Sequence, residues 1–285
     1  MGHHFVPRYY LRAFQDQVTP GHTWITSRRS AQPVLAPIAN VAQARGYYDP
    51  AVEIDLHDLV ESPANPVLDK LRAGEAITLE ERITFAVYIA TMMTRGPGRR
   101  SQADELYPKV LKDTVEGLRA QLIQRSADPS ANQQVISAHL EQLDAIHEKY
   151  LREPPESVTQ QVRMPWPTYD MVQAVATMRW CLFSTGEPHC FITSDNPVFY
   201  FRCYGLSKPE SEISFPLSPT RLLHGLRGKI SPVLHTAEAR APLVKEFNRR
   251  MASAASSIVL AHKTLPWSVT LLTKSKHHLN RVNWT

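Results

Sequence analysis

The chain has 285 residues, 43% of them hydrophobic, which is enough to bury a sizeable core and indicates a globular protein of one large domain or two small ones. Three cysteines without paired spacing predict neither a disulfide scaffold nor a four-ligand zinc site, so a reducing cytoplasm is the expected location. No apolar run approaches the roughly 20 residues of a membrane-spanning helix, so no membrane is expected among the partners. A formal net charge of +5 favours anionic partners, such as nucleic acid or nucleotides, without requiring them.

The first residues, His3-His4-Phe5-Val6-Pro7-Arg8-Tyr9-Tyr10-Leu11-Arg12-Ala13-Phe14, predict a short amphipathic helix. Proline suits a first helical turn, and Tyr10, Leu11 and Phe14 form an apolar stripe that could anchor the segment. The two imidazoles then lie just before the helix, where a neutral imidazole can bind a metal or exchange a proton. We expect this helix to dock against a sheet formed later in the chain.

The next elements are a hairpin and a long helical region. Residues 22–26 and 33–35 flank a turn and read as two short strands. Residues 50–66 have helical spacing closed by Ser62-Pro63, and Thr78 to Glu81 resembles a capping box at the start of a further helix. Gly96-Pro97-Gly98 should end that helix. Two more helices are expected over 101–125 and 132–151, and the three should pack as an antiparallel group.

The later part of the chain shifts toward strands. Residues 153–167 are proline-rich and are the best candidate for a linker. A helix is expected over 169–183 and another over 243–260. Strands are expected over 190–193, 198–201, 214–217, 222–226 and 268–272. The expected fold is therefore a single α+β domain over 1–285, helix-rich in its N-terminal and central part with a mostly antiparallel C-terminal sheet; the alternative is a subdivision into 1–152 and 168–285.

Three segments carry a family resemblance. They are His4-Phe5-Val6-Pro7 with the Tyr10-Leu11 and Phe14 positions, Thr193-Ser194-Asp195-Asn196-Pro197-Val198, and Phe215-Pro216-Leu217-Ser218-Pro219. In this order they resemble the uncharacterised bacterial family called domain of unknown function 4238, and weaker similarity lies in Asn40-Val41-Ala42. The resemblance spans nearly the whole chain, and it implies no established activity.

The Asp195-Asn196 turn is the first candidate for chemistry. It follows a strand-like run, and strand ends fix the position of a side chain that the turn exposes. The competing interpretation is an Asx-type turn in which either side chain bonds the local backbone before Pro197. The sequence leaves both open, although the family resemblance, which combines this turn with the N-terminal histidine, favours a working carboxylate.

A divalent metal is one way to use these residues. His4, Asp195 and one of Glu53 or Glu61 would supply the nitrogen and oxygen ligands that zinc, manganese or magnesium accept. The His-His-Phe-Val-Pro start also resembles the first element of His-Asn-His nucleases, in which a histidine activates water. The gaps from His4 to Asn40 and His57 are too long for that compact motif.

The leading hypothesis is a hydrolase acting on a phosphate-bearing substrate, such as a metal-dependent nuclease or nucleotide hydrolase in phage defence or with a toxin-like role. His4 would act as general base or metal ligand, Asp195 would hold metal or orient water, and Asn196 would fix the scissile group. The residues expected to bind phosphate are Arg8, Arg95, Arg99 and Arg100. The alternative is a non-catalytic module that binds nucleic acid or protein, in which the His and Asp-Asn motifs latch the N-terminus onto the sheet.

Overall fold

The fold was analysed in a computed structural model, which describes residues 2–29, 32–47, 49–155, 164–228, 231, 233–274 and 277–284. The chain divides into two compact units, one made of residues 1–98 together with 165–285 and the other of residues 99–164. The first unit joins both ends of the chain, and the borders between the two units lie at residues 98/99 and 164/165. The helices are combined with mostly antiparallel strands, so the fold class is α+β, as predicted.

A five-stranded sheet in the order β10-β5-β9-β8-β7 forms the centre of the first unit. Only β10 and β5 pair in parallel; the remaining pairs are antiparallel. Successive side chains of a strand point to opposite faces, and in β5 Trp180 and Leu182 join one buried cluster whereas Cys181 and Phe183 join another. The sheet is therefore buried on both faces. The strands are β5 (Arg179–Ser184), β7 (Phe199–Tyr200), β8 (Glu212–Ser218), β9 (Arg221–Leu226) and β10 (Leu234–Glu238).

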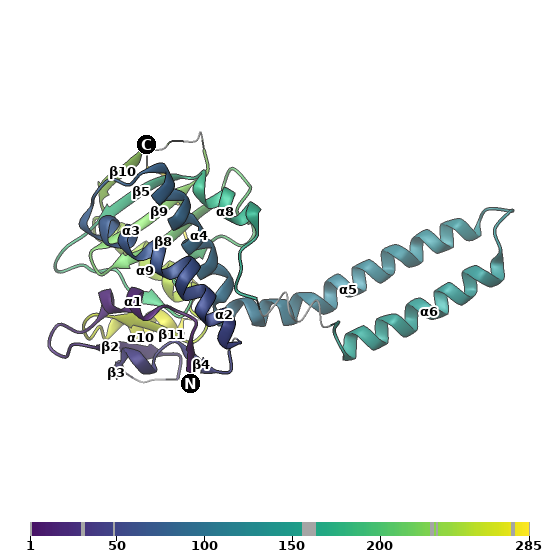
Figure 1. The fold of residues 1–285 in the computed structure, drawn as a ribbon, viewed down its shortest axis with the longest axis horizontal. Helices are drawn as coiled ribbons and strands as arrows, with labels where there is room; N and C mark the ends of the chain where they lie inside the picture. Colours follow the sequence, from purple (N-terminus) through teal and green to yellow (C-terminus); the bar gives the residue numbers. More distant parts are fainter. Residues whose placement is uncertain are drawn as a thin grey trace. The chain divides into compact units, whose positions relative to one another are not determined.

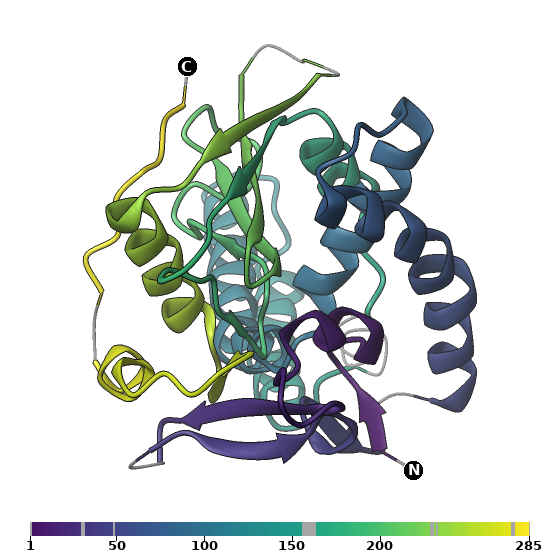
Figure 2. The same cartoon turned by 90° about the vertical axis from the view of Figure 1, so that its left-hand side faces the viewer.

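Helices cover the two faces of this sheet. The helices α3 (Ser62–Ala73), α4 (Leu79–Arg95) and α8 (Tyr169–Ala176) pack on one side, and α9 (Ala241–Ala254) on the other (Figure 2). The Thr78 hydroxyl accepts a hydrogen bond from the backbone N–H of Glu81, whose carboxylate accepts the backbone N–H of Thr78 in return. This capping box confirms the start of α4 that the sequence predicts.

A second sheet, in the order β3-β2-β11-β6, joins the two ends of the chain. Its members are β2 (His22–Ser27), β3 (Val34–Pro37), β6 (Thr193–Ser194) and β11 (Ile258–Ala261). The expected hairpin of β2 and β3 is confirmed, and β2 also pairs with β11. Because strands more than 200 residues apart in sequence share this sheet, the N-terminal and C-terminal segments fold as one body.

The N-terminal helix docks as expected. Helix α1 (Arg8–Leu11) continues into the 3₁₀ turn Arg12–Phe14, and Tyr10, Leu11 and Phe14 are fully buried. The Tyr10 hydroxyl lies 2.6 Å from the Thr193 hydroxyl in β6 and donates to the carbonyl of Pro216 in β8 at 2.7 Å. The apolar stripe thus anchors the helix against both sheets.

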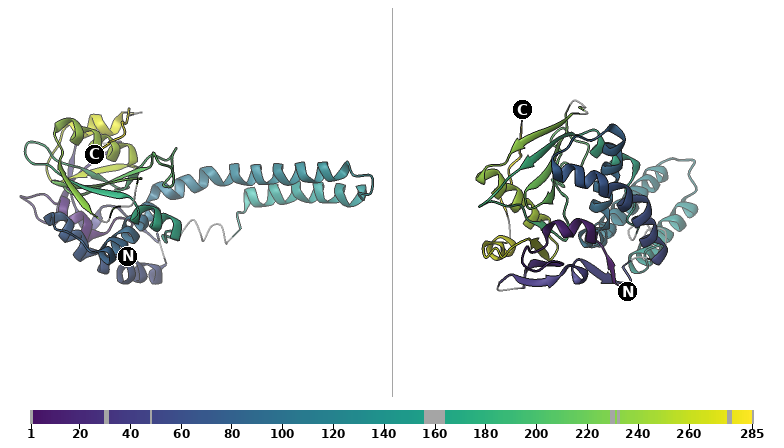
Figure 3. Two further views of the ribbon diagram at one scale, coloured as in Figure 1. Left: turned by 90° about the horizontal axis from the view of Figure 1, so that it is seen from above. Right: turned by 60° about the vertical axis from the view of Figure 1, so that its left-hand side comes forward.

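The second unit is a helical hairpin. Helices α5 (Pro97–Ser126) and α6 (Gln133–Arg152) run side by side and antiparallel (Figures 1 and 3). The Tyr107 hydroxyl donates to the carbonyl of Tyr150 at 3.0 Å, and an ion pair joins Arg119 to Asp144. Val115 and Ile136 are the buried apolar side chains of these two helices among the described residues. The predicted helices 101–125 and 132–151 are confirmed within a few residues.

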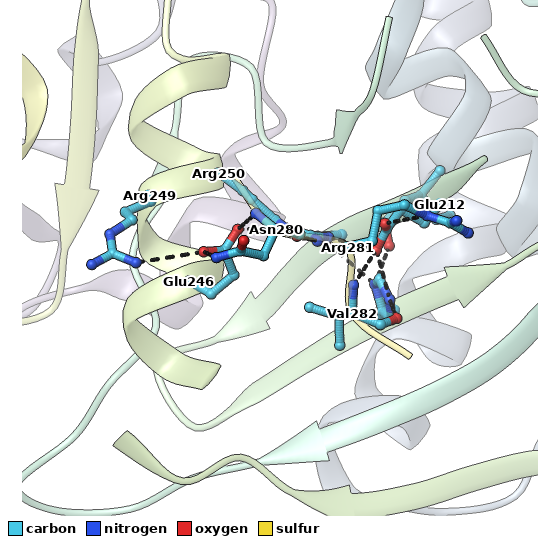
Figure 4. Close-up of polar contacts among 10 residues, drawn as sticks. Glu212, Glu246, Arg249, Arg250, Asn280, Arg281 and Val282 are labelled. Carbon is cyan, nitrogen blue, oxygen red and sulfur yellow. Dashed lines mark hydrogen bonds and ion pairs between the residues drawn. The ribbon is translucent and has the colours of Figure 1, made fainter. Parts of the chain in front are cut away.

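The segment after α10 (Trp267–Thr273) returns along the sheet and is held by buried charges (Figure 4). Glu212 and Arg250, both fully buried, form an ion pair at 3.0 Å. The Glu212 carboxylate accepts the backbone N–H of Val282, and Arg250 donates to the carbonyl of Asn280. A buried ion pair is tolerated when further hydrogen bonds satisfy its remaining atoms, and here the tail supplies two of these bonds.

Several predicted elements are wrong in kind or extent. Residues 179–183 form β5, because the helix α8 ends at Ala176 and a run of large apolar side chains enters the sheet. Residues 258–260 belong to β11, beyond the end of α9 at Ala254. Residues 268–272 lie in α10. Helix α3 starts at Ser62 and places Pro63 in its first turn, where proline is tolerated, so the helical path does not stop there.

Candidate functional site

Asp195 is a buried structural acceptor. It is 1% exposed and follows β6. Its Oδ1 accepts the backbone N–H of Ser256 at 2.8 Å, and its Oδ2 accepts the N–H of Ser257 at 2.7 Å, the Ser257 hydroxyl at 2.8 Å and the N–H of Ile258 at 3.2 Å. Burial raises the pKa of Asp195, and these hydrogen bonds oppose the rise. The carboxylate therefore fixes the connection between α9 and β11.

Asn196 holds the same connection from the neighbouring position. Its Nδ2 donates to the carbonyl of Ala254 at 2.9 Å and to the Ser256 hydroxyl at 2.8 Å. An ideal Cβ on Gly96 would lie 2.1 Å from Oδ1 of Asn196, so only glycine allows the end of α4 to approach this turn so closely. These contacts favour the structural interpretation of the Asp-Asn motif.

His4 lies at a different place, in the short strand β1 (Gly2–His4), which pairs with β4 (Gln43–Arg45). Its imidazole is half-buried. Burial and then the charge of Arg8 lower the pKa of His4, and a hydrogen bond with the backbone of Val41 opposes them in part. Its Nδ1 is buried and has no hydrogen-bond partner in the part of the chain that the structure describes. A neutral imidazole of this kind can accept a proton.

Three further side chains surround the backbone of His4. Arg95, at the end of α4, has a side chain that is 1% exposed; its Nη1 lies 2.5 Å from Oε1 of Glu61, and its Nη2 donates to the carbonyl of His4. Glu53 accepts the backbone N–H of His4, and burial raises the pKa of the Glu53 carboxyl, as does the charge of Glu61. We call His4, Glu53, Glu61 and Arg95 the His4 cluster.

Unusual backbone conformations occur at this cluster. Glu53 lies in α2 (Pro50–Asp55) and Glu61 ends the π-helical turn Leu56–Glu61. In a regular α-helix, two side chains eight residues apart point about 80° away from each other around the helix axis. A π turn is wider and rotates less per residue, so it brings Glu53 and Glu61 onto one face. Ala42, which accepts the N–H of Phe5 at 2.9 Å, has φ +52° although it is not glycine. Such features are frequent at functional sites.

The structure thus separates the predicted site residues into two groups. Four of them form the His4 cluster, while the Asp195-Asn196 turn binds the α9–β11 connection. Arg8 is exposed and acts electrostatically on His4, and the side chains of Arg99 and Arg100 lie outside the described residues. Across the described residues, no three His, Cys, Asp or Glu side chains are close enough together to hold a metal ion, so His4, Asp195, Glu53 and Glu61 do not form one ligand shell.

Tyr88 is a neighbour that the sequence did not indicate. It is 1% exposed in α4, its hydroxyl has no hydrogen-bond partner among the residues described, and burial together with the charge of Glu61 raises its pKa well above the ordinary value. A tyrosine in the middle of an amphipathic helix looks like any core residue in the sequence. The π turn near Tyr88 would have drawn attention to it, but residue spacing in the sequence does not reveal a π turn.

The structure defines an α+β protein in which the half-buried His4 cluster joins the first strand to the helices α2 and α4. A family model described as "Protein of unknown function (DUF4238)" matches residues 2–264, and the chain belongs to this family. Searches of curated proteins and of solved structures gave no match. Among the described helices, none is both long and apolar enough to cross a membrane.

Proposed function

We propose that the protein is a hydrolase acting on a phosphate-bearing substrate and that the His4 cluster is its reaction centre. The observation that carries the proposal is the pairing of opposite pKa shifts in one place: His4 is pushed toward the neutral base and Glu53 toward the protonated acid. Pairs of titratable groups shifted in this way are typical of acid–base sites. The buried unpaired Nδ1 of His4 and Oε2 of Glu53 support it, because such atoms are rare and costly without a functional reason.

In the proposed reaction His4 accepts a proton from water through Nδ1 as the water oxygen bonds to phosphorus. The bond from phosphorus to the leaving oxygen breaks, and the Glu53 carboxyl donates its proton to that oxygen. Arg8, which is exposed, would contact the phosphate. Arg95 has both terminal nitrogens bonded within the cluster, and in this proposal it positions Glu61 and the His4 backbone.

The test is hydrolysis of labelled RNA, DNA and nucleotides by the purified protein, with chelator and with added Mg²⁺, Mn²⁺ or Zn²⁺ in separate arms. We expect His4→Ala and Glu53→Gln to lower turnover at least 100-fold, the effect of losing a general acid or base. His278→Ala, an exposed histidine in the tail, is the matched control. A protein inert toward all substrates in every metal arm would overturn the proposal.

A second candidate function is a binding module for nucleic acid or protein, because the side chains of Asp195 and Asn196 bond the α9–β11 connection and so have a structural use, although they do not latch the N-terminus. This module would bind labelled RNA or DNA without turnover, and binding would fall with salt as counterions are released. For either function we propose a cytoplasmic location, which would keep the exposed thiol of Cys203 reduced. We also propose a part in phage defence or a toxin-like role, and phage challenge of cells that express the protein would test it.

A further inference from the structure

A cavity of about 610 Å³ opens between α9, α10 and the loop Pro188–Cys190. None of these elements carries the His4 cluster. The volume falls within the range of about 300–1,000 Å³ typical of small-molecule sites. Part of its wall is apolar, because the buried side chains of Cys190, Val244 and Leu265 line it. Burial raises the pKa of Cys190 to about 11, so this thiol stays neutral and adds no charge to the cavity.

The charged part of the wall is entirely basic. Lys245 and Arg249 lie one turn apart on α9, and Lys274 follows α10. No Asp or Glu lines the cavity, and in the described part of the chain neither lysine has an ion-pair partner. Arg249 has one acidic neighbour, Glu246, at 3.5 Å (Figure 4), which leaves its other nitrogens available. Three cations in a wall that no carboxylate lines, two of them without an ion-pair partner among the described residues, favour an anionic ligand, above all one with several acceptor oxygens.

The cavity also presents an aromatic face. Trp267, the first residue of α10, lines it and is 44% exposed. Tryptophan left half-exposed beside a cavity offers a flat surface on which an aromatic ring can stack. Another part of the wall is fixed in place, because Asn248 donates to the carbonyl of Cys190 at 2.9 Å and accepts the N–H of Ile192 at 3.0 Å. A rigid wall reduces the ordering cost of binding.

We propose that this cavity binds a nucleoside monophosphate, with the base against Trp267 and the phosphate among Lys245, Arg249 and Lys274. A base has flat apolar faces that can lie against Trp267 and the apolar part of the wall, and a sugar phosphate has none. The proposal concerns other elements than the hydrolase proposal and does not depend on it.

Isothermal titration of the full-length protein with AMP tests the assignment. We expect saturable binding at one site, weakened at least fivefold by Trp267→Ala, as loss of one stacked base implies. Lys245→Ala combined with Lys274→Ala should weaken it by at least tenfold and reduce its salt dependence. Lys109→Ala combined with Lys208→Ala removes two exposed lysines outside the cavity and serves as the charge-matched control. Circular dichroism of each variant verifies folding.

The probes separate the two halves of the ligand. Adenosine and inorganic phosphate should each bind more weakly than AMP by at least tenfold. His4→Ala should bind AMP as wild type does, so failure of the hydrolase proposal and failure of this one give different results. The assignment is overturned if AMP does not bind, if folded Trp267 and lysine variants bind it as tightly as wild type, or if only a 5′-phosphorylated oligonucleotide binds.

Discussion

Removing the Asp195 carboxylate should unfold the connection that it holds before it affects any chemistry. Its four hydrogen bonds come from three backbone N–H groups and one hydroxyl. A hydrogen bond to a charged acceptor contributes about 1.5–3 kcal/mol, but these donors are only partly buried and water can replace some of the lost partners. We therefore expect Asp195→Ala to lower the free energy of unfolding by about 3–5 kcal/mol, well below the simple sum.

Two milder variants grade the effect. In Asp195→Asn the amide nitrogen should replace Oδ1, which accepts only the N–H of Ser256. Two donors then face each other, and we expect the free energy of unfolding to fall by about 2 kcal/mol. Ser257→Ala removes one neutral hydroxyl bond and should cost about 1 kcal/mol. Urea denaturation of all three variants measures the order. If Asp195→Ala has the urea midpoint of the wild type but has lost hydrolysis, Asp195 does not hold the α9–β11 connection, and a catalytic role for its carboxylate is favoured instead.

Other predictions concern the N-terminus and the buried charges. The pKa of His4 in the folded protein lies below its ordinary 6.5, so as the pH falls below that value the unfolded chain takes up a proton first. The free energy of unfolding and the rate of hydrolysis should therefore both decline at acidic pH. Arg8→Gln should move the acid limb of the rate profile to higher pH, whereas the control Arg12→Gln should leave it in place. Phe14→Ala should lower the free energy of unfolding by about 3–5 kcal/mol in urea titrations, and an unchanged midpoint would mean that the N-terminal helix is not packed. Glu212→Gln leaves a buried guanidinium without its closest carboxylate and should cost about 3–5 kcal/mol by the same assay, whereas a gain in stability would show that the pair is a net burden.

The sequence by itself determined the helix starts and ends that depend on residues close together in the chain. The capping residues Thr78 and Glu81, the Gly96-Pro97-Gly98 break and the apolar spacing of Tyr10, Leu11 and Phe14 each act within a few residues, and the structure has them as predicted. The predictions were wrong where a continuous apolar run showed neither the helical nor the strand periodicity of hydrophobic residues. Residues 179–183 are buried on both faces of a sheet, so their pattern does not distinguish strand from helix.

The candidate site depended on the tertiary structure. His4, Glu53, Glu61 and Arg95 were all named from the sequence, but His4 and Arg95 are 91 residues apart and meet only because β1 pairs with β4 beside the end of α4. Asp195 looked equally suited to chemistry, and only its donors, which come from a segment about 60 residues later, show that its oxygens are already used. Spacing along a chain predicts which residues share a face of one element; which faces meet, and how much water they exclude, is decided by packing between elements.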